Sequence, residues 1–407
     1  MKEAFRRIIA QVKGMAANNT KGKSSAKGKT KGSTNVNKAK DNDSDKLPKP
    51  YEELVNIIVL MARYLKYDFC SFEGDAVYIY IKTHWQKISS YELKVFLKEC
   101  LCSLLNNDVR GSNRKSVEDL VKQFPFSIMS LNVKPAKNKI NFLNGTLDLL
   151  TGNFEQHNPQ DYLRYVLPYN YDPNATCPMF GKYIKRVVPD LDVQNVLAEY
   201  IAWLFTDIKL EKVLFLYGSG CNGKSVFIDI VEALVGKDNV CHESITDMCG
   251  ENGSNHRSNI VGKLLNTCSD VAPNSFHGDL FKRLASGEPI STKVLYQDVN
   301  STTDYAKMLF SLNELPKTKD LTDGYFRRLL IVPFKVQIPK NEINPNLAKE
   351  IIANELPGVM RWVLIGYSRL LQNQRFSHSK VIDSALEEYR NKYNTKKKKS
   401  LIILPPY

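Results

Sequence analysis

The 407-residue sequence has no apolar run that approaches the length of a membrane span, and its first residues lack the apolar segment of a signal peptide. We therefore expect a soluble intracellular protein with no membrane partner. Cysteine is also sparse, because only eight residues are scattered along the chain and none forms a C-x-x-C pair. This spacing argues against a disulfide framework and favours reduced thiols in the cytoplasm or the nucleus.

Most of the chain has little excess charge of either sign. The formal net charge is +14, but residues 1–50 contain 13 Lys/Arg against 4 Asp/Glu, and Lys396–Lys399 are also positive. The remainder is close to neutral. The basic composition therefore describes two tails and does not by itself indicate a nucleic-acid-binding surface.

Residues 1–48 are predicted to form a disordered basic arm, because they are rich in Lys, Gly, Ser, Thr and Asn. Within it, Met1–Met15 has the apolar spacing of an amphipathic helix that is too short to be stable alone. Such an arm can hold DNA or RNA weakly and with strong salt dependence, or it can serve as a solvated linker. The sequence favours neither role over the other.

Residues 49–175 are predicted to form a mixed α+β domain and residues 176–208 a helical collar. Residues 139–153 show a strand–turn–strand pattern. No paired acidic motif with a partnering histidine occurs here, so we expect no nucleotidyl-transfer site. The helices expected in these regions are Tyr51–Tyr67, Tyr91–Leu105, Ser116–Gln123, Met179–Val187 and Val193–Phe205.

The most informative stretch combines a strand, a glycine-rich loop and a helix. The apolar strand Val213–Tyr217 leads into G-x-x-x-x-G-K-S, and apolar residues then recur at helical spacing. Glycines let successive backbone N–H groups face a phosphate at the positive end of the helix. Lys224 can reach the outer phosphates of a nucleoside triphosphate, and Ser225 can bind Mg²⁺. The alternative, a chance match in a turn, is disfavoured by the order of strand and helix. The predicted site is Gly218, Ser219, Gly220, Cys221, Asn222, Gly223, Lys224 and Ser225.

Polar residues at the ends of later strands add catalytic candidates. Asp270 ends a short strand, where a carboxylate can hold Mg²⁺ through water and polarise the attacking water; an exposed strand-end aspartate is the plain alternative. Asn313 follows the strand Tyr305–Leu312, where an amide can orient that water. Arg327 and Arg328 precede another apolar strand and can neutralise charge on the γ-phosphate of a neighbouring subunit.

Two further patterns are weaker. Ile290–Tyr296 and Ala306–Leu312 are predicted to pair as a hairpin with its tip near residues 297–303. Zinc accepts cysteine and histidine ligands, but the spacing of the local candidates fits no usual paired knuckle, so we expect scattered loop and core residues instead. These candidates are Cys241, His242, Cys249 and His256.

The ordered set of motifs resembles the superfamily 3 helicases, and most closely the helicase half of phage and plasmid primase–helicases of the poxvirus type. The resemblance covers about residues 50–393. It is carried by Gly218–Ser225, Ser269-Asp270, Phe281–Ile290, Ser311–Pro316 and Gly324–Phe334, with Ile140–Gly152 and Leu167–Pro173 before them and the segment from Glu355–Trp362 through Tyr389 after.

The resemblance implies an α/β fold: an AAA+-like P-loop ATPase domain with a central β-sheet at residues 209–340, a helical C-terminal segment at 341–393 and a basic, apolar tail at 394–407. It implies an ATP-dependent DNA helicase, a homo-hexameric ring that uses ATP and Mg²⁺ on single-stranded and forked DNA, in replication of a phage, plasmid or mobile element. The compartment would be the host cell cytoplasm, or the nucleus.

The family's roles transfer residue by residue. Lys224 would bind the β/γ-phosphates and Ser225 the Mg²⁺; Asp270 would be the acid at the metal and water. Asn313 would sense the γ-phosphate, and Arg327 would be the arginine finger, with Arg328 as the alternative. The DNA-gripping hairpin would use Lys293 and Tyr296, for which ordinary strand residues are the alternative.

The sequence departs from the family in three places. Ser269 stands where many relatives have a second acid, so the division of roles around Asp270 is open. Residues 1–50 are too short for a primase domain, which makes a separate primase and other replication proteins the expected partners. The lysine run and apolar end after Tyr393 suggest a truncated or frameshifted product, with a natural basic tail as the alternative. The competing functions are a P-loop DNA motor of another class and a weakly hydrolysing DNA-binding ring protein.

Overall fold

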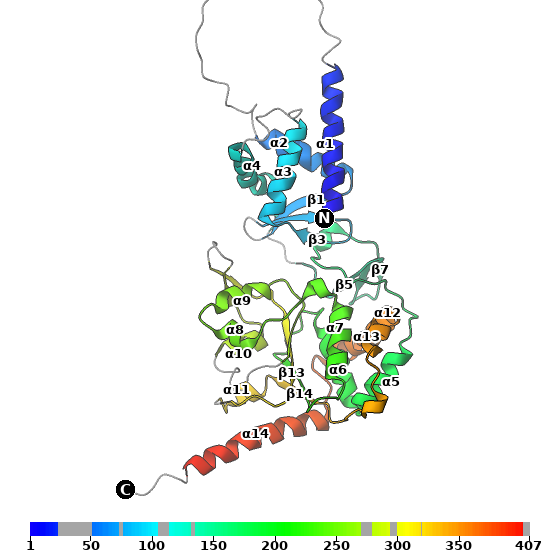
Figure 1. Ribbon diagram of the computed structural model, residues 1–407, viewed down its shortest axis with the longest axis vertical. Coiled ribbons are helices and arrows are strands. Elements are labelled where there is room, and N and C mark those ends of the chain that lie inside the picture. The colour runs from blue at the N-terminus through cyan, green and yellow to red at the C-terminus, as the bar shows by residue number, and fades with distance from the viewer. Residues whose placement is uncertain are drawn as a thin grey trace, which may run out of the picture. The chain divides into compact units, whose positions relative to one another are not determined.

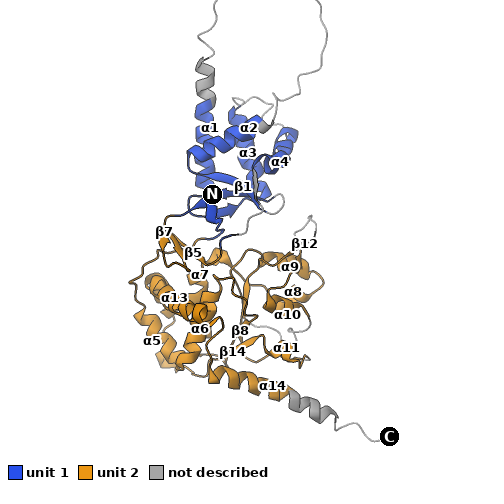
Figure 2. Cartoon of the chain, turned by 180° about the vertical axis from the view of Figure 1, so that it is seen from behind, with its two compact units in different colours: residues 1–136, 157–165 blue, residues 137–156, 166–407 orange. Residues whose placement is uncertain are grey.

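The computed structural model of the protein describes residues 1–22, 51–72, 76–104, 114–131, 135–269, 279–293, 299–318 and 320–401. The chain forms two compact units (Figure 2). Unit 1 comprises Met1–Ala136 and His157–Tyr165, and unit 2 comprises Lys137–Gln156 and Val166–Tyr407. Within the described residues, no helix is both long and apolar enough to span a membrane.

Unit 1 packs helices against a four-stranded sheet with the order β3-β2-β1-β4. Strands β1 and β2 are antiparallel, whereas β1 and β4 are parallel. The core centres on Phe69, Phe96 and Phe124, and all three side chains are fully buried. The elements are α1 (Lys2–Gly22), α2 (Tyr51–Tyr64), β1 (Asp68–Phe72), β2 (Val77–Tyr80), β3 (Trp85–Lys87), α3 (Ser90–Leu104), α4 (Arg114–Ser127), β4 (Met129–Leu131) and the 3-10 helix η2 (Pro159–Asp161).

Helix α1 differs from the disordered arm expected to begin at the first residue. Its apolar residues Ala4, Ile8 and Val12 recur every four positions and are buried, and Phe5 stacks on Phe96 with ring centroids 4.4 Å apart. A short amphipathic helix is marginal in isolation, but α1 gains the apolar partners that it needs from α2 and α3. The rest of the expected arm, residues 23–48, lies outside the described residues.

Unit 2 is built around a five-stranded, all-parallel sheet with the order β14-β8-β13-β10-β9. Figure 1 shows α6, α7 and α13 on one side of this sheet and α8, α9 and α10 on the other. Strands of a parallel sheet that are covered on both faces read as continuous apolar runs, which explains the central strand Val213–Tyr217 and the buried edge strand Leu329–Pro333. The strands are β8 (Val213–Tyr217), β9 (Val240–Cys241), β10 (Leu265–Ser269), β13 (Lys307–Leu312) and β14 (Leu329–Pro333).

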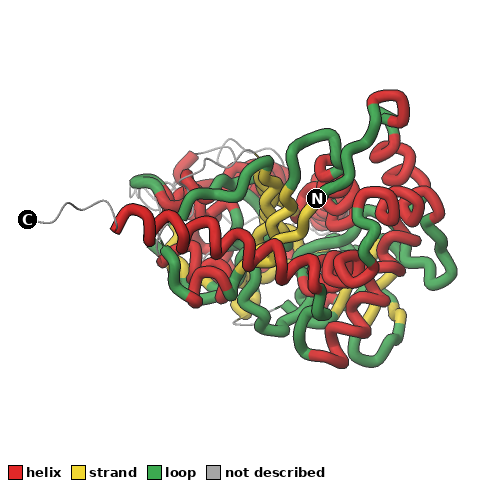
Figure 3. Tube along the Cα trace, turned by 90° about the horizontal axis from the view of Figure 1, so that it is seen from below, coloured by secondary structure: helices red, strands yellow, loops and turns green. Residues whose placement is uncertain are grey.

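The helices of unit 2 connect and cover these strands. Helix α14 packs against β14, and Figure 3 shows it crossing beneath the sheet. The helices are α5 (Pro178–Val187), α6 (Leu191–Trp203), α7 (Lys224–Val235), α8 (Ile245–Cys249), α9 (Gly253–Asn259), α10 (Asp279–Ser286), α11 (Asp323–Phe326), α12 (Leu347–Asn354), α13 (Leu356–Asn373) and α14 (Lys380–Leu401), with the 3-10 helices η3 (Lys237–Asn239) and η4 (Lys340–Glu342).

A small antiparallel sheet, β5 (Lys139–Phe142), β6 (Gly145–Asp148) and β7 (Phe154–Glu155), forms from the predicted strand–turn–strand segment. The other predicted hairpin was wrong in its second strand. Strand β11 (Ile290–Thr292) pairs with β12 (Asn300–Thr302), while β13 joins the central sheet between β8 and β10. The reason is that Met308–Phe310 is apolar on both faces, which suits a central strand rather than a hairpin arm.

Candidate nucleotide-binding site

The phosphate loop lies at the carboxyl edge of the central sheet. It connects β8 to α7, and the backbone N–H of Gly218 donates to the carbonyl of Leu312 at the end of β13 over 3.1 Å. On the other side, the N–H of Phe334 donates to the carbonyl of Tyr217 over 2.7 Å. Because the strands are parallel, the residues that follow them meet at this edge, where ligands bind in open α/β sheets.

Two glycines of the loop have no room for a side chain. A Cβ at Gly218 would lie 2.2 Å from Nδ2 of Asn222 and 2.5 Å from the carbonyl oxygen of Phe334. Gly223 has a φ of +87°, and a Cβ there would lie 2.7 Å from Cγ1 of Val187. Close packing and a left-handed backbone therefore explain why glycine stands at both ends of the motif.

The middle of the loop is held by the segment that follows β14. The buried side chain of Asn222 donates from Nδ2 to the Phe334 carbonyl over 3.1 Å. The carbonyl of Cys221, itself at a φ of +47°, accepts from the N–H of Ile338 over 2.9 Å. These contacts between protein groups hold the backbone of the loop in its curled conformation.

Lys224 is pointed back into the loop and toward Asn313. Its Nζ donates to the Gly218 carbonyl at 2.5 Å, to Oδ1 of Asn222 at 3.2 Å and to Oδ1 of Asn313 at 3.4 Å. The residue is only 5% exposed, and burial lowers the pKa of its ammonium group. The structure therefore brings together two residues that are 89 positions apart in the sequence. Ser225 is exposed in the first turn of α7.

Tyr183 is a site neighbour that the sequence did not single out. Its hydroxyl donates to the carbonyl of Gly223 over 2.7 Å, and its ring lies beside the same glycine. Burial holds the pKa of this hydroxyl well above its usual value, so it remains a donor. The periodicity of Met179–Val187 predicts a helix there, but no sequence pattern relates that helix to a loop forty residues later.

Arg327 and Arg328 lie at the opposite, amino edge of the sheet, where β14 begins. The Arg327 side chain is 64% exposed and 3.6 Å from a Glu211 carboxylate oxygen. Arg328 is only 9% exposed; its Nε donates to Oγ of Ser286 over 2.9 Å, and its Nη1 donates to the carbonyl of Gly324. The structure thus distinguishes a solvent-facing guanidinium from one that is used to hold α10 and α11.

The remaining site candidates are placed only in part. Asp270 and Tyr296 lie outside the described residues, although Ser269 is the exposed last residue of β10, next to β13 at the carboxyl edge. Lys293 is exposed just after β11, and its backbone N–H donates to the carbonyl of Ser254 over 2.9 Å. It belongs to the β11–β12 hairpin and is not placed beside Lys224 by any described contact.

The candidate zinc ligands serve other contacts. Nδ1 of His242 lies 2.9 Å from the Thr267 hydroxyl, and Nδ1 of His256 lies 2.8 Å from a Glu243 carboxylate oxygen. The thiol of Cys241 is buried and its pKa is raised to about 12 by that burial. Among the residues that the structure describes, no group of three histidine, cysteine or acidic side chains could hold a metal ion.

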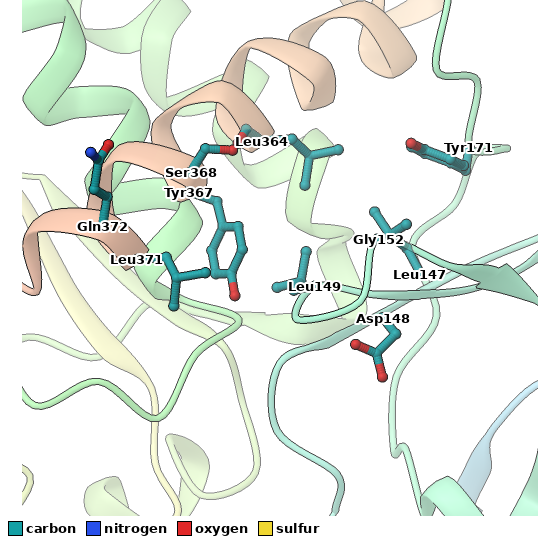
Figure 4. A pocket seen from close by; sticks show the side chains of 10 residues that line it. All are labelled: Leu147, Asp148, Leu149, Gly152, Tyr171, Leu364, Tyr367, Ser368, Leu371 and Gln372. Atoms are coloured by element: carbon teal, nitrogen blue, oxygen red, sulfur yellow. Dashed lines mark hydrogen bonds between the residues drawn. The ribbon is translucent and has the colours of Figure 1, made fainter.

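A cavity of about 350 Å³ lies elsewhere in unit 2, between the β6–β7 turn and α13 (Figure 4). Leucines from both elements line it, and the hydroxyl of Tyr367 is buried without a hydrogen-bond partner within the described structure. None of its lining residues belongs to the phosphate loop or to the strand ends around it. It is therefore a separate feature from the nucleotide site.

Two family models match the chain. Residues 59–189 match the family described as D5 N terminal like. Residues 216–328 match a family of unknown function, DUF5906. The second match runs from the end of β8 to Arg328 and therefore contains the phosphate loop, Asn313 and the arginine pair.

Similar proteins include viral proteins that are named as putative helicases. A protein of Acanthamoeba polyphaga mimivirus named "Putative helicase" is 24% identical over 282 residues, which is 62% of this chain and 29% of that protein. A protein of Invertebrate iridescent virus 3 with the same kind of name is 26% identical over 227 residues, 52% of this chain and 24% of that one. An uncharacterized mitochondrial protein of Marchantia polymorpha is 28% identical over 148 residues, 32% of this chain and 82% of that protein. The chain thus matches less than a third of the length of these two viral relatives.

The fold also has solved counterparts. The apo structure of the C-terminal region of NrS-1 aligns with a TM-score of 0.51 at 10% identity, covering 85% of this chain and 76% of that one. A second apo form aligns with the same TM-score over 82% and 74%. The five-stranded parallel sheet, the mixed N-terminal region and the helical C-terminus are thus a known arrangement. With a D5 N terminal like region followed by a DUF5906 region, the chain is a distant homologue of viral proteins named as putative helicases, which confirms the resemblance to helicases drawn from its motifs.

Proposed function

We propose that this protein is an ATP-dependent DNA helicase of superfamily 3, which acts as a homo-hexameric ring on single-stranded DNA in replication of a phage, plasmid or other mobile element. One observation carries the proposal. Lys224 and Asn313 meet at the carboxyl edge of the sheet, while the exposed Arg327 stands at the amino edge. The chain therefore presents the two complementary halves of a nucleotide site at different places.

The half at the carboxyl edge receives ATP and Mg²⁺. Backbone N–H groups of residues 218–225 surround the phosphates, Lys224 binds the outer ones and Ser225 takes the metal. Lys224 contacts Gly218, Asn222 and Asn313, and a bound triphosphate would replace these partners. Asn313 then contacts the γ-phosphate, and Asp270, the residue after β10 in the sequence, holds the metal and orients the attacking water.

The half at the amino edge serves a neighbouring subunit. The backbone N–H of Val213 donates to the Arg328 carbonyl, so the arginine pair flanks the start of β8, while the phosphate loop follows its end. Five extended residues span about 16 Å. Arg327 is thus too far from the phosphate loop of its own chain, and its exposed guanidinium is placed to reach another copy.

DNA contacts are assigned to the β11–β12 hairpin. The exposed Lys293 would neutralise backbone phosphates, and Tyr296 would stack on a base, which gives sequence-tolerant binding to a single strand. Forked DNA is the substrate, and a separate primase and other replication proteins are the partners. The host cell cytoplasm, or the nucleus, is the proposed compartment.

The proposed domains keep the limits expected from the sequence. They are a basic arm at 1–48, an α+β domain at 49–175, a helical collar at 176–208, an AAA+-like ATPase domain at 209–340, a helical segment at 341–393 and a tail at 394–407. The parallel sheet and its phosphate loop support the ATPase limits, because β8 to β14 all fall within them.

A DNA-binding ring protein that hydrolyses ATP weakly is the second candidate. The observation that favours it is Ser269, which ends β10 with a hydroxyl in place of a second carboxylate beside Asp270. In this alternative the nucleotide closes the ring on DNA, and turnover remains slow even when DNA is present.

ATP hydrolysis measured with and without single-stranded DNA tests the proposal. Wild type should show DNA-stimulated turnover, and both Lys224→Ala and Arg327→Ala should lose at least about 100-fold, the scale of one lost electrostatic catalytic group. Arg186→Ala is the matched control, because Arg186 is also an exposed arginine paired with a glutamate, at 2.9 Å from Glu342. Turnover without DNA stimulation would reject the translocase and leave an ATPase. Tight nucleotide binding without turnover would favour the ring protein.

A further inference from the structure

The loop after β13 and the helix α11 carry the proposed contacts to two different nucleotides. Asn313 contacts Lys224 of the phosphate loop, and Arg327, the exposed residue that directly follows α11, is the one proposed to serve a neighbouring subunit. No sequence pattern predicts that these two elements share a contact. In the structure, both are hydrogen-bonded to one side chain of the C-terminal helix α14.

That side chain is Tyr389, which is 2% exposed. Its hydroxyl donates to the carbonyl of Pro316 over 2.7 Å, and it lies 3.2 Å from the hydroxyl of Tyr325 in α11. A carbonyl only accepts, so the single Tyr389 proton is used on Pro316, and Tyr325 must donate to the Tyr389 oxygen. A directed chain of hydrogen bonds therefore runs from α11 through α14 to the loop after β13.

The surrounding packing makes this chain stiff. The ring of Tyr389 contacts that of Phe326 at a centroid distance of 5.7 Å, and the ring of Tyr325 contacts that of Phe281 at 5.5 Å. One residue further along α14, Arg390 donates from Nη2 to Oδ1 of Asp323 over 2.8 Å, at the start of α11. A buried, close-packed group of this kind moves as a unit rather than deforming gradually.

Few residues separate Asn313 from the Pro316 carbonyl that Tyr389 binds. Pro316 is three residues after Asn313, and its ring fixes φ, which stiffens the turn between them. Leu315 packs against the same buried cluster as Tyr389 and Tyr325. If a γ-phosphate displaces Asn313, the Pro316 carbonyl should therefore move with it, because the segment between the two residues is short and stiff.

We propose that Tyr389 is a positioning residue that couples the phosphate-sensing loop of one nucleotide site to the Arg327 turn that serves the next. The coupling rests on the proposed function. When a triphosphate occupies the site at Asn313, the shift of the Pro316 carbonyl moves Tyr389, and through Tyr325 it resets α11 and the direction of Arg327. Occupancy of one subunit's site by a triphosphate thus changes the position of the arginine that this subunit supplies to its neighbour's site.

Hydrogen exchange of the backbone amides tests the coupling with a non-hydrolysable ATP analogue as the probe. The Arg327→Ala protein is the background, because it removes the contact with a neighbour's phosphate that we propose for the residue after α11. We expect the analogue to slow exchange in residues 218–225 and also in α11. Adding Tyr389→Phe, which keeps the ring and removes the hydroxyl, should abolish the slowing in α11 and leave that in the loop.

The matched control is Tyr367→Phe, which removes another buried tyrosine hydroxyl of unit 2, one without a partner within the described structure. It should leave the slowing in α11 unchanged. The proposal is overturned if α11 shows no slowing in the Arg327→Ala background, or if the slowing survives Tyr389→Phe. Absence of any effect of the analogue on residues 218–225 would instead contradict nucleotide binding itself, so the two failures are distinct.

Discussion

Arg327 and Arg328 are adjacent in sequence and share a Glu211 carboxylate oxygen, at 3.6 and 3.7 Å, but they differ in exposure. Arg327 faces solvent, whereas the Arg328 guanidinium is buried between Ser286 and the Gly324 carbonyl. The sequence favours Arg327 as the finger only by resemblance, and the two exposures now support that choice on physical grounds. The same exposures separate the consequences of removing each side chain.

Arg328→Ala should lower the free energy of unfolding by roughly 2–4 kcal/mol, because buried partners lose a charged donor and a cavity is left. Arg327→Ala should change it by less than about 0.5 kcal/mol, since an exposed ion pair contributes little. Urea unfolding of both proteins, followed by circular dichroism, checks the prediction. Equal destabilisation by the two changes would show that Arg328 is not the structural member of the pair.

Lys307 gives a prediction for pH. Burial lowers the pKa of its ammonium group to about 7, although the group lies 4.0 Å from the centroid of the Trp203 ring, a contact that favours the charged form. Because the folded pKa lies below that of the unfolded chain, the cost of burying the charge is fully present below pH 7. As the pH rises above 7 the folded chain releases this proton first, so the cost is relieved.

The free energy of unfolding should therefore rise between pH 7 and pH 9 more in wild type than in Lys307→Met, by at most about 1.4 kcal/mol per pH unit. Methionine keeps the unbranched shape without the charge, so it serves as its own packing control. Urea titrations of both proteins at pH 6, 7, 8 and 9 measure the difference. Parallel pH profiles would mean that Lys307 does not titrate in this window.

Helix α5 connects the phosphate loop to the start of α13. The first turn of α5 donates hydrogen bonds to both oxygens of the buried Glu355 carboxylate. The donors are the backbone N–H groups of Met179 and Phe180, each over 2.9 Å. These are the groups that a helix start leaves unpaired, and a negative charge there is favourable. The other end of α5 presents Tyr183 and Val187 to Gly223.

Glu355→Ala should destabilise unit 2 by about 2–3 kcal/mol, because two buried N–H groups lose a charged acceptor. It should also weaken nucleotide binding, since α5 supports the phosphate loop. Glu355→Gln, which keeps one acceptor oxygen, should show about half the loss. The exposed Glu342 provides the control, and Glu342→Ala should be neutral in both urea unfolding and nucleotide titration. A normal nucleotide affinity in Glu355→Ala would separate α5 from the loop.

Strands and helices were predictable where a local pattern defines them. Val213–Tyr217 is β8 with the expected bounds, because a continuous apolar run before a glycine-rich loop has few other solutions. The meeting of Lys224 with Asn313 follows from the rule that parallel strands end at one edge. The partner of β11 and the contact of Tyr183 with Gly223 depend on long-range packing, which no local spacing encodes.

At the scale of the whole molecule, the two units are interleaved along the chain. His157–Tyr165 belongs to unit 1 although unit 2 residues precede and follow it. Within unit 1, the indole of Trp85 donates to the Pro159 carbonyl over 2.8 Å, and its backbone N–H donates to that of Leu163. A boundary read from composition alone cannot find such a return segment, because its residues are ordinary loop residues.

If the ring is the active unit, two inactive proteins should restore each other. A Lys224→Ala subunit lacks its own phosphate contact but supplies Arg327, and an Arg327→Ala subunit does the reverse. Random mixing should leave about a quarter of the interfaces intact in a closed ring. ATP turnover of the mixture should therefore exceed that of either protein alone. A mixture as inactive as its components would argue against action between subunits.

The packing of Gly223 against Val187 and Tyr183 has a practical consequence for protein engineering. The first family match ends at residue 189 and the second begins at residue 216. These limits would suggest residues 190–215 as the junction for exchanging the ATPase region with that of a relative. Such a chimera would combine the phosphate loop of a relative with the native α5. The contacts of Val187 and Tyr183 would then have to fit a loop with which they do not normally pack. A junction placed before Pro178 would carry the supporting helix together with the loop it supports.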